Sequence, residues 1–175
     1  MTITYKRLTK KEYRGRVLHF EYESDRIYRV SREGDSFLIH EETLPSPIHK
    51  AFADKLFEPH WSRPRAVGAF DGGHLAGVVE WCEERWCGRL RITNLCVERE
   101  YRRQGIGASL MAKAREFGKA HGFRELVLEC QNINAGAIAF YKRMGFTLQG
   151  LDVTQYRMNP DMAEEIRFEM MMEVG

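Results

Sequence analysis

Cysteine is scarce in this chain of 175 residues, which contains four: Cys82, Cys87, Cys96 and Cys130. None of them forms a CxxC pair and no two pairs have a zinc-like spacing, which excludes a disulfide framework and a zinc finger. Reduced thiols in this number are typical of a cytoplasmic protein. Glycine and proline are also limited, at 15 and 5 residues, which excludes collagen-like and low-complexity chains.

Long hydrophobic runs and an excess of one charge are missing as well. No uninterrupted apolar run approaches the ~20 residues of a membrane-spanning helix, and residues 1–16 lack the apolar core of a secretory signal. We therefore expect a cytoplasmic protein with no membrane partner. The formal net charge of +2 is too balanced for a dedicated nucleic-acid binder. The six histidines have no HxH or HExxH spacing, and no metal site is expected.

The amino-terminal third alternates apolar and polar residues over short stretches. Residues 2–8 are expected to form an edge strand. Three further short strands are predicted at residues 17–22, 27–30 and 37–40. After two prolines, Ile48, Phe52 and Leu56 follow one another at a spacing of four, which predicts a short helix that ends before Pro59.

From residue 65 onward the pattern is clearer. Two apolar runs joined by Asp71-Gly72-Gly73-His74 predict a hairpin. Helices are expected at residues 106–121, closed by Gly122, and at residues 134–144, stopped by Gly145. Strands are expected at residues 66–70, 75–81, 90–97, 125–130, 146–156 and 166–172. The order β-β-β-α-β-α-β-β predicts a mixed α/β three-layer fold rather than a doubly wound sheet.

The most informative segment is a basic turn between a strand and a helix, Arg102-Arg103-Gln104-Gly105-Ile106-Gly107. Glycine permits positive φ and lets a ligand approach the main chain closely. Successive N–H groups and the partial positive charge at the helix N-terminus form an anion site, and the arginines can add charge-assisted hydrogen bonds. These features predict a site for a pyrophosphate. The alternative is a glycine-rich helix start with solvated arginines.

Two other phosphate-binding motifs do not fit this turn. A Walker loop requires GxxxxGK[ST], which does not occur around Gly105. The dinucleotide fingerprint GxGxxG fails because Leu110 occupies the third glycine position. The remaining form is R-x-x-G-x-G.

This turn resembles the acetyl-CoA pyrophosphate loop of the GCN5-related N-acetyltransferases. A second signature, from Asn134 through Ala139-Phe140-Tyr141 to Gly145-Phe146, is similar to the family pattern N-x-x-A-x-x-F-Y-x-x-x-G-F. The resemblance implies an α/β/α three-layer domain over residues 1–175 with a mixed, mostly antiparallel sheet. It implies an acetyl-CoA-binding core at about residues 66–172 and an acceptor-side segment at about residues 1–65.

The resemblance also implies which residues bind acetyl-CoA. In the family the strand before the loop pairs with the pantetheine arm, and the loop amides hold the pyrophosphate. Asn134 resembles the asparagine that contacts the pantetheine arm, although its position is also that of a helix N-cap. The cofactor-binding set is Leu95, Cys96, Val97, Arg102, Arg103, Gln104, Gly105, Ile106, Gly107, Ala108, Asn134, Ala137 and Tyr141.

The resemblance implies direct acetyl transfer to a primary amine in a ternary complex, with an acid and a base. Tyr141 resembles the family tyrosine that protonates the leaving thiolate; the alternative is a core aromatic. Glu129 is the first candidate for the base because a carboxylate in a largely apolar strand is costly unless it is paired or functional. Glu80 is the second candidate. For each, an ion pair with an arginine is the structural alternative.

The carboxy-terminal third is similar to streptothricin acetyltransferases, which acetylate an amine of a cationic antibiotic. Asp152 and Tyr156 match acidic and aromatic residues of these enzymes and are expected to bind a cationic acceptor, together with Glu80 and Trp81. Cys130 departs from their pattern. A protein amino terminus, a polyamine and a non-catalytic acyl-CoA sensor remain alternatives, and exposed strand edges favour a homodimer.

Overall fold

The computed structural model describes residues 2–162 and 164–175. Every strand and helix that was expected after residue 65 is present, in the expected order. The elements are β1 (Ile3–Leu8), α1 (Lys10–Tyr13), β2 (Val17–Glu33), β3 (Ser36–Lys55), β4 (Arg65–Asp71), β5 (His74–Glu84), β6 (Arg89–Val97), η1 (Arg99–Tyr101), α2 (Ile106–Ala120), β7 (Glu125–Gln131), α3 (Ala135–Arg143), β8 (Thr147–Asp152), η2 (Pro160–Met162) and β9 (Arg167–Glu173).

Seven strands pair in the order β1-β4-β5-β6-β7-β9-β8, and β2 and β3 form a separate two-stranded sheet. β1 lies at one edge of this sheet, as predicted, and pairs antiparallel with β4. The pairs β4–β5, β5–β6 and β8–β9 are also antiparallel, whereas β6 and β7 are parallel. This mixed sheet confirms the predicted α/β fold class.

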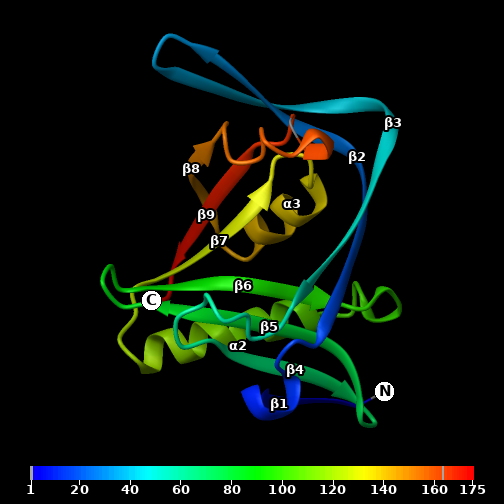
Figure 1. Ribbon diagram of the computed structural model, residues 1–175, viewed down its shortest axis with the longest axis vertical. Helices are drawn as coiled ribbons and strands as arrows, with labels where there is room; N and C mark the ends of the chain where they lie inside the picture. Colours follow the sequence, from blue (N-terminus) through cyan, green and yellow to red (C-terminus); the bar gives the residue numbers. More distant parts are fainter. Residues whose placement is uncertain (1, 163) are drawn as a thin grey trace. The chain divides into compact units, whose positions relative to one another are not determined.

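The chain divides into two compact units (Figure 1). The first unit comprises Met1–Phe20, Phe52–Leu128 and Met172–Gly175, and the second comprises Glu21–Ala51 and Glu129–Met171. Both are discontinuous in sequence, because β2, β3, β7 and β9 each pass from one unit into the other. A single domain over residues 1–175 stays a prediction.

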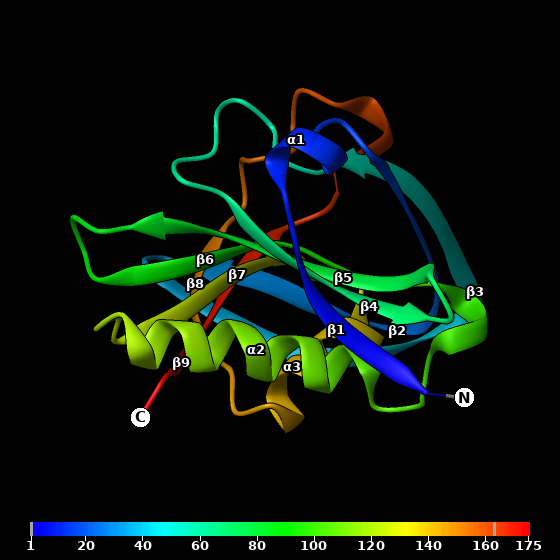
Figure 2. The same cartoon turned by 90° about the horizontal axis from the view of Figure 1, so that it is seen from below.

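In the first unit α2 lies along the face formed by β4, β5 and β6 (Figure 2). Its buried stripe includes Ile106 and Leu110, as the helical spacing predicted. A Cβ added at Gly77 of β5 would lie 3.0 Å from the Cys96 carbonyl oxygen and 3.3 Å from Leu110 Cδ1. Glycine at this position therefore allows β6 and α2 to pack closely on β5. Among the described residues, no helix combines the length and hydropathy that a membrane crossing requires.

The predictions for residues 17–58 are partly wrong. Instead of three short strands and a helix, β2 and β3 are two long strands that turn at Gly34, whose φ is 62°. Ile48 and Phe52 belong to β3 because a spacing of four residues shares one face in a strand as well as in a helix. Prolines 45 and 47 are tolerated in β3 because a two-stranded ribbon leaves one edge of each strand unpaired.

Candidate functional site

The basic glycine turn leads from β6 through η1 to α2 within the first unit. Arg103 and Gly105 both have positive φ, at 60° and 80°. Glycine adopts this conformation readily, whereas a residue with a side chain adopts it rarely, so the turn has a defined, partly strained backbone. Strain of this kind is typical of ligand-binding turns.

The first turn of α2 presents free backbone donors. Gly105 is the N-cap, and the N–H of Ser109 donates to its carbonyl oxygen at 3.0 Å. The amides of Ile106, Gly107 and Ala108 precede this first bond and therefore have no intrahelical acceptor. Three N–H groups at the positive end of a helix dipole fit a diphosphate.

The two arginines of the turn have different surroundings. The Nε of Arg102 donates to the Val97 carbonyl oxygen at 2.9 Å and so ties the turn to the end of β6. Gln104 donates to the Glu100 carbonyl oxygen at 2.9 Å. The side chain of Arg103 is exposed. Arg102 therefore shapes the turn, whereas Arg103 can reach an anion in solution.

Among the described residues, the last residues of β6 have no partner strand on the side where β7 pairs with the start of β6. The ladder with β7 covers Arg89–Ile92 and Glu125–Leu128, whereas β5 pairs with β6 as far as Val97. Leu95, Cys96 and Val97 therefore lie beyond the end of the parallel ladder, as a strand that pairs with a pantetheine arm would require. Burial raises the pKa of the Cys96 thiol to about 11, which argues against a thiolate there.

Glu80 is fully buried and accepts three hydrogen bonds within the first unit. Its Oε1 accepts from the Phe57 N–H at 2.6 Å. Its Oε2 accepts from the Thr93 hydroxyl at 2.8 Å and from Asn94 Nδ2 at 3.0 Å. Glu80 pairs with Asn94 in the β5–β6 ladder, immediately before an irregularity in the register. The carboxylate therefore holds this irregular part of the ladder together with the segment after β3.

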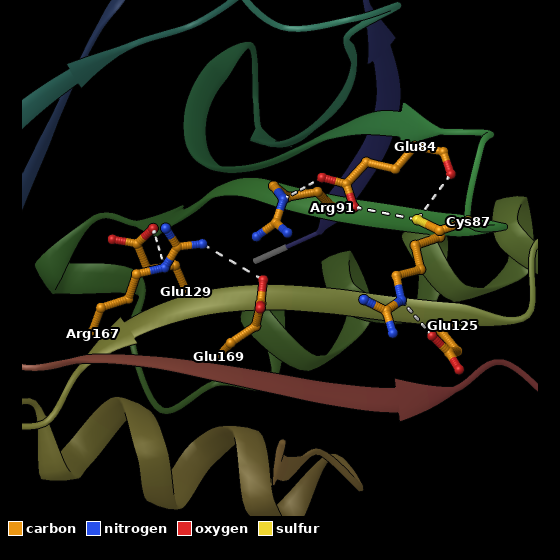
Figure 3. Close-up of polar contacts among 8 residues, drawn as sticks. Glu84, Cys87, Arg91, Glu125, Glu129, Arg167 and Glu169 are labelled. Atoms are coloured by element: carbon orange, nitrogen blue, oxygen red, sulfur yellow. Dashed lines mark hydrogen bonds and ion pairs between the residues drawn. The ribbon is translucent and has the colours of Figure 1, made fainter. Parts of the chain in front are cut away.

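Trp81 and the acidic residues after it also lie in the first unit. Trp81 is buried, and its ring packs 5.3 Å from that of Phe117. Glu83 pairs with Arg85 at 2.7 Å. Glu84 pairs with Arg91 at 2.5 Å and also accepts a contact from the Cys87 thiol (Figure 3). Glu83 and Glu84 thus already have arginine partners, and binding of an acceptor by Trp81 stays a prediction.

In the second unit Glu129 and Tyr156 lie together. The Tyr156 hydroxyl donates to Glu129 Oε1, and Arg167 Nε lies 3.2 Å from Glu129 Oε2. Figure 3 shows the Arg167 guanidinium directed to Glu129 and to Glu169, which it reaches at 3.6 Å. Burial and the Glu129 carboxylate raise the pKa of Tyr156, which stays a neutral donor. The arginine pair that the sequence left open for Glu129 is thus present, and its role as a base stays a prediction.

Asp152 ends β8 and is engaged locally. Its Oδ1 accepts from the Thr154 N–H at 2.7 Å and from the Thr154 hydroxyl at 2.6 Å. These hydrogen bonds hold the pKa of Asp152 below its usual range, so the side chain is an anion at neutral pH. Asp152 pairs with Arg167 in the β8–β9 ladder. An acidic and aromatic group of side chains therefore surrounds Arg167.

Asn134 is the N-cap of α3, which confirms one of its two predicted roles. Its Oδ1 accepts from the Ala137 N–H at 3.0 Å. This bond satisfies one of the free donors of the first turn. The other predicted role, contact with the pantetheine arm, stays a prediction, as does that of Ala137.

Tyr141 lies on the second half of α3. Its ring packs edge-on against Phe140 and Phe146, with centroids 5.4 and 5.8 Å away. The residue is partly exposed, but burial of its hydroxyl raises its pKa, with a smaller contribution from Cys130. The phenol therefore keeps its proton at neutral and mildly alkaline pH, as a general acid must.

The second unit also contains a polar cluster that was not predicted from the sequence, formed by Tyr22, Lys50, Asn132 and Glu165. Glu165 is 7% exposed and pairs with Lys50. Asn132 belongs to the segment that resembles streptothricin acetyltransferases, but Tyr22, Lys50 and Glu165 belong to no motif, and Glu165 follows a polar stretch that is typical of a solvated loop. Alternation in β2 placed Tyr22 on a strand but gave no reason to connect it with a residue far along the chain.

The structure thus gathers the predicted residues in separate groups. The first unit contains the glycine turn, the end of β6, Glu80 and Trp81, and the second contains Glu129, Asn134, Tyr141, Asp152 and Tyr156. Among the residues that the structure describes, no group of three His, Cys, Asp or Glu side chains could hold a metal ion.

Comparison with known proteins agrees with this geometry. Residues 31–146 match the acetyltransferase (GNAT) family. The chain is 36% identical over 141 residues to streptothricin acetyltransferase from Streptomyces lavendulae, which covers 75% of this chain and 74% of that protein. The crystal structure of nourseothricin acetyltransferase matches with a TM-score of 0.86 and 33% identity over 100% of both chains. A Bacillus anthracis protein solved with acetyl coenzyme A, at 18% identity, shares the fold with a TM-score of 0.77 over 99% of this chain and 98% of that chain.

The mixed sheet and the glycine turn before α2 define an acyltransferase that takes its acyl group from a coenzyme A thioester. The chain belongs to the GNAT family of acetyltransferases. It is an N-acetyltransferase that uses acetyl-CoA, and the free amides at the start of α2 together with the unpaired end of β6 fit that molecule.

Proposed function

We propose that this enzyme acetylates a primary amine of a small cationic antibiotic of the streptothricin class. The observation that carries the proposal is the 36% identity to the Streptomyces lavendulae streptothricin acetyltransferase over three quarters of the chain. The match to nourseothricin acetyltransferase over both whole chains supports it, because it includes the amino-terminal segment, where the sequence by itself pointed to no acceptor.

Separate groups of residues bind acetyl-CoA and transfer the protons in this proposal. The amides of residues 106–108 and the exposed Arg103 bind the pyrophosphate. The part of β6 beyond its ladder with β7, at Leu95 to Val97, pairs with the pantetheine arm. Acetyl-CoA supplies the activated acetyl group as a thioester. Tyr141 donates a proton to the departing sulfur, because its raised pKa keeps the phenol protonated.

Glu129 is the proposed base, and its two partners set a condition on that role. Both of its oxygens are engaged, by Tyr156 and by Arg167. For Glu129 to take up the amine proton, it must therefore lose its contact with Tyr156 or Arg167, or one of these partners must pass the proton on. Asp152 and Tyr156 are proposed to orient the cationic acceptor.

The test is acetyl transfer by the purified enzyme to streptothricin, with spermidine and a short peptide as comparison acceptors. We expect release of the coenzyme A thiol with streptothricin, and a mass spectrum that contains the acetylated antibiotic. Faster turnover with the peptide or with spermidine contradicts the acceptor class. Binding of acetyl-CoA by calorimetry without turnover of any amine favours a sensor instead of an enzyme.

A further inference from the structure

Two polar atoms of the second unit are buried without a hydrogen-bond partner among the described residues: the Tyr22 hydroxyl and Oε2 of Glu165. Tyr22 lies on β2, and Glu165 lies in the segment between η2 and β9. Leaving a buried carboxylate oxygen without a donor is unfavourable. Such atoms are rare in folded proteins, where a buried polar atom usually has a protein group, a water molecule or an ion as its partner.

The two atoms belong to one cluster. Lys50 of β3 pairs with Glu165, and its neighbour His49 places Nδ1 3.6 Å from Oε2 of Glu23, the residue after Tyr22 on β2. Tyr22 therefore lies in the same part of the β2–β3 hairpin as Lys50. In agreement with this placement, burial and then the charge of Glu165 raise the pKa of the Tyr22 hydroxyl.

Glu165 is held in a fixed position by its backbone neighbours. Its own N–H donates to the Met162 carbonyl oxygen at 2.8 Å. The next residue, Ile166, donates to Asn132 Oδ1 at 2.8 Å and accepts from the Asn132 N–H at 2.9 Å. Asn132 also donates through Nδ2 to the Tyr28 carbonyl oxygen of β2 at 2.9 Å. The buried side chain of Asn132 thus ties the Glu165 segment to the strand that carries Tyr22.

The ion pair with Lys50 shows that the Glu165 carboxylate binds an ammonium group. Its ammonium group pairs with Oε1 of Glu165, and its side chain is 20% exposed. The second oxygen, Oε2, is buried and has no hydrogen-bond partner among the described residues. A carboxylate oxygen accepts hydrogen bonds from N–H donors, and a phenol oxygen can accept one more. An ammonium group of a ligand would supply donors to both.

We infer that Glu165 and Tyr22 bind an ammonium group of the amine substrate. Oε2 of Glu165 is the oxygen that accepts the main hydrogen bond from this ammonium group. Lys50 competes for the same carboxylate and limits its affinity for a cation. This inference rests on the proposed function and adds residues to it that no sequence motif contains.

Steady-state kinetics with acetyl-CoA and streptothricin test the inference. Glu165→Gln removes the charge at constant shape, and we expect the KM for streptothricin to rise about tenfold to hundredfold while the KM for acetyl-CoA stays within about twofold. Tyr22→Phe is expected to raise the same KM about threefold to tenfold. Lys50→Met removes the competing cation and is expected to lower it. Glu164→Gln, at an exposed neighbouring position, is the control and is expected to change neither constant.

A purely structural Lys50–Glu165 ion pair predicts a different result. Both partners' variants would then melt at lower temperature, and the KM for streptothricin would be the same as in the wild type. That outcome, or a rise of KM in Lys50→Met equal to that in Glu165→Gln, overturns the inference. If Glu165→Gln does not fold, Tyr22→Phe still decides, because an unchanged KM there also overturns it.

The two proposals fail in different ways. A wild-type enzyme that does not acetylate streptothricin refutes the proposed function. A wild-type enzyme that acetylates it, with Glu165 and Tyr22 variants of unchanged KM, refutes only the present inference. Calorimetry with streptothricin alone gives a second readout, in which equal affinities of the wild type and Glu165→Gln contradict it.

Discussion

Replacing Glu80 separates a structural carboxylate from a catalytic one. This side chain is fully buried, and its oxygens accept from the Phe57 N–H, the Thr93 hydroxyl and Asn94 Nδ2. Two of these donors belong to β6 and one to the segment after β3. We therefore expect that removing the carboxylate destabilises the first unit, whether or not the residue takes part in catalysis.

The expected magnitude follows from the three donors. A hydrogen bond to a charged group contributes about 1.5–3 kcal/mol, and a buried donor that loses its acceptor is left unsatisfied. In Glu80→Ala all three donors lose their acceptor and a cavity remains, so we expect a loss of about 4 kcal/mol or more. In Glu80→Gln the amide oxygen can keep the Phe57 N–H, and its NH2 group can donate to the Thr93 hydroxyl. The expected loss is then about 1–3 kcal/mol.

The assay is urea unfolding followed by circular dichroism, with kcat and both KM values measured on the same preparations. Glu98→Gln is a control, because Glu98 is a partly exposed carboxylate whose partner is His74 at 2.5 Å. We expect a change within about 0.5 kcal/mol for this variant. The kcat of Glu80→Gln is expected to stay within a few-fold of the wild type.

Two outcomes refute this reasoning. A Glu80→Ala variant as stable as the wild type would mean that the three hydrogen bonds contribute little. A Glu80→Gln variant that keeps its stability but loses more than about a hundredfold in kcat would identify Glu80 as the general base. Glu129 would then have only its structural contacts with Tyr156 and Arg167.

Three further predictions concern the donor side of the reaction and α3. Tyr141→Phe is expected to lower kcat about 10²–10⁴-fold, as measured by stopped-flow release of the coenzyme A thiol. The wild-type rate should not fall between pH 7 and about pH 9, because burial raises the pKa of this phenol above its ordinary value of 10. An unchanged kcat in the variant would reject Tyr141 as the general acid. Gly105→Ala places a Cβ at a φ of 80° and is expected to weaken acetyl-CoA binding about tenfold, as measured by calorimetry. Gly122→Ala, at a φ of 74° after α2, is the control and should lower only stability. Equal affinities of the two variants for acetyl-CoA would contradict the role of the turn. Asn134→Ala is expected to reduce the free energy of unfolding by about 1 kcal/mol and Asn134→Ser by less, as measured in urea; equal losses would show that the cap bond is unimportant.

The elements that could be predicted from the sequence are those with a strong local signal. α2 begins after a glycine that needs positive φ and ends before another, and its apolar spacing matches the buried stripe. The hairpin at Gly72 and Gly73 and the N-cap at Asn134 are equally local. Each depends on residues within about four positions, and short-range sterics and hydrogen bonds suffice to determine them.

The long hairpin could not be predicted in this way. Ile48 and Phe52 fit one face of a helix and one face of a strand equally well, so periodicity did not distinguish the two. The pairing of β3 with β2 decides for the strand, because backbone donors and acceptors of residues 17–33 are satisfied by a segment that follows the turn at Gly34.

The surroundings of the carboxylates could not be predicted from the sequence either. The sequence by itself determined the fold class and the positions of the glycine turn before α2 and of Tyr141 on α3, since these depend on motifs of contiguous residues. Only the tertiary structure decided which groups surround Glu80, Glu129 and Glu165, because their partners come from distant strands and loops. Burial and hydrogen bonding depend on those long-range contacts, and no local pattern encodes them.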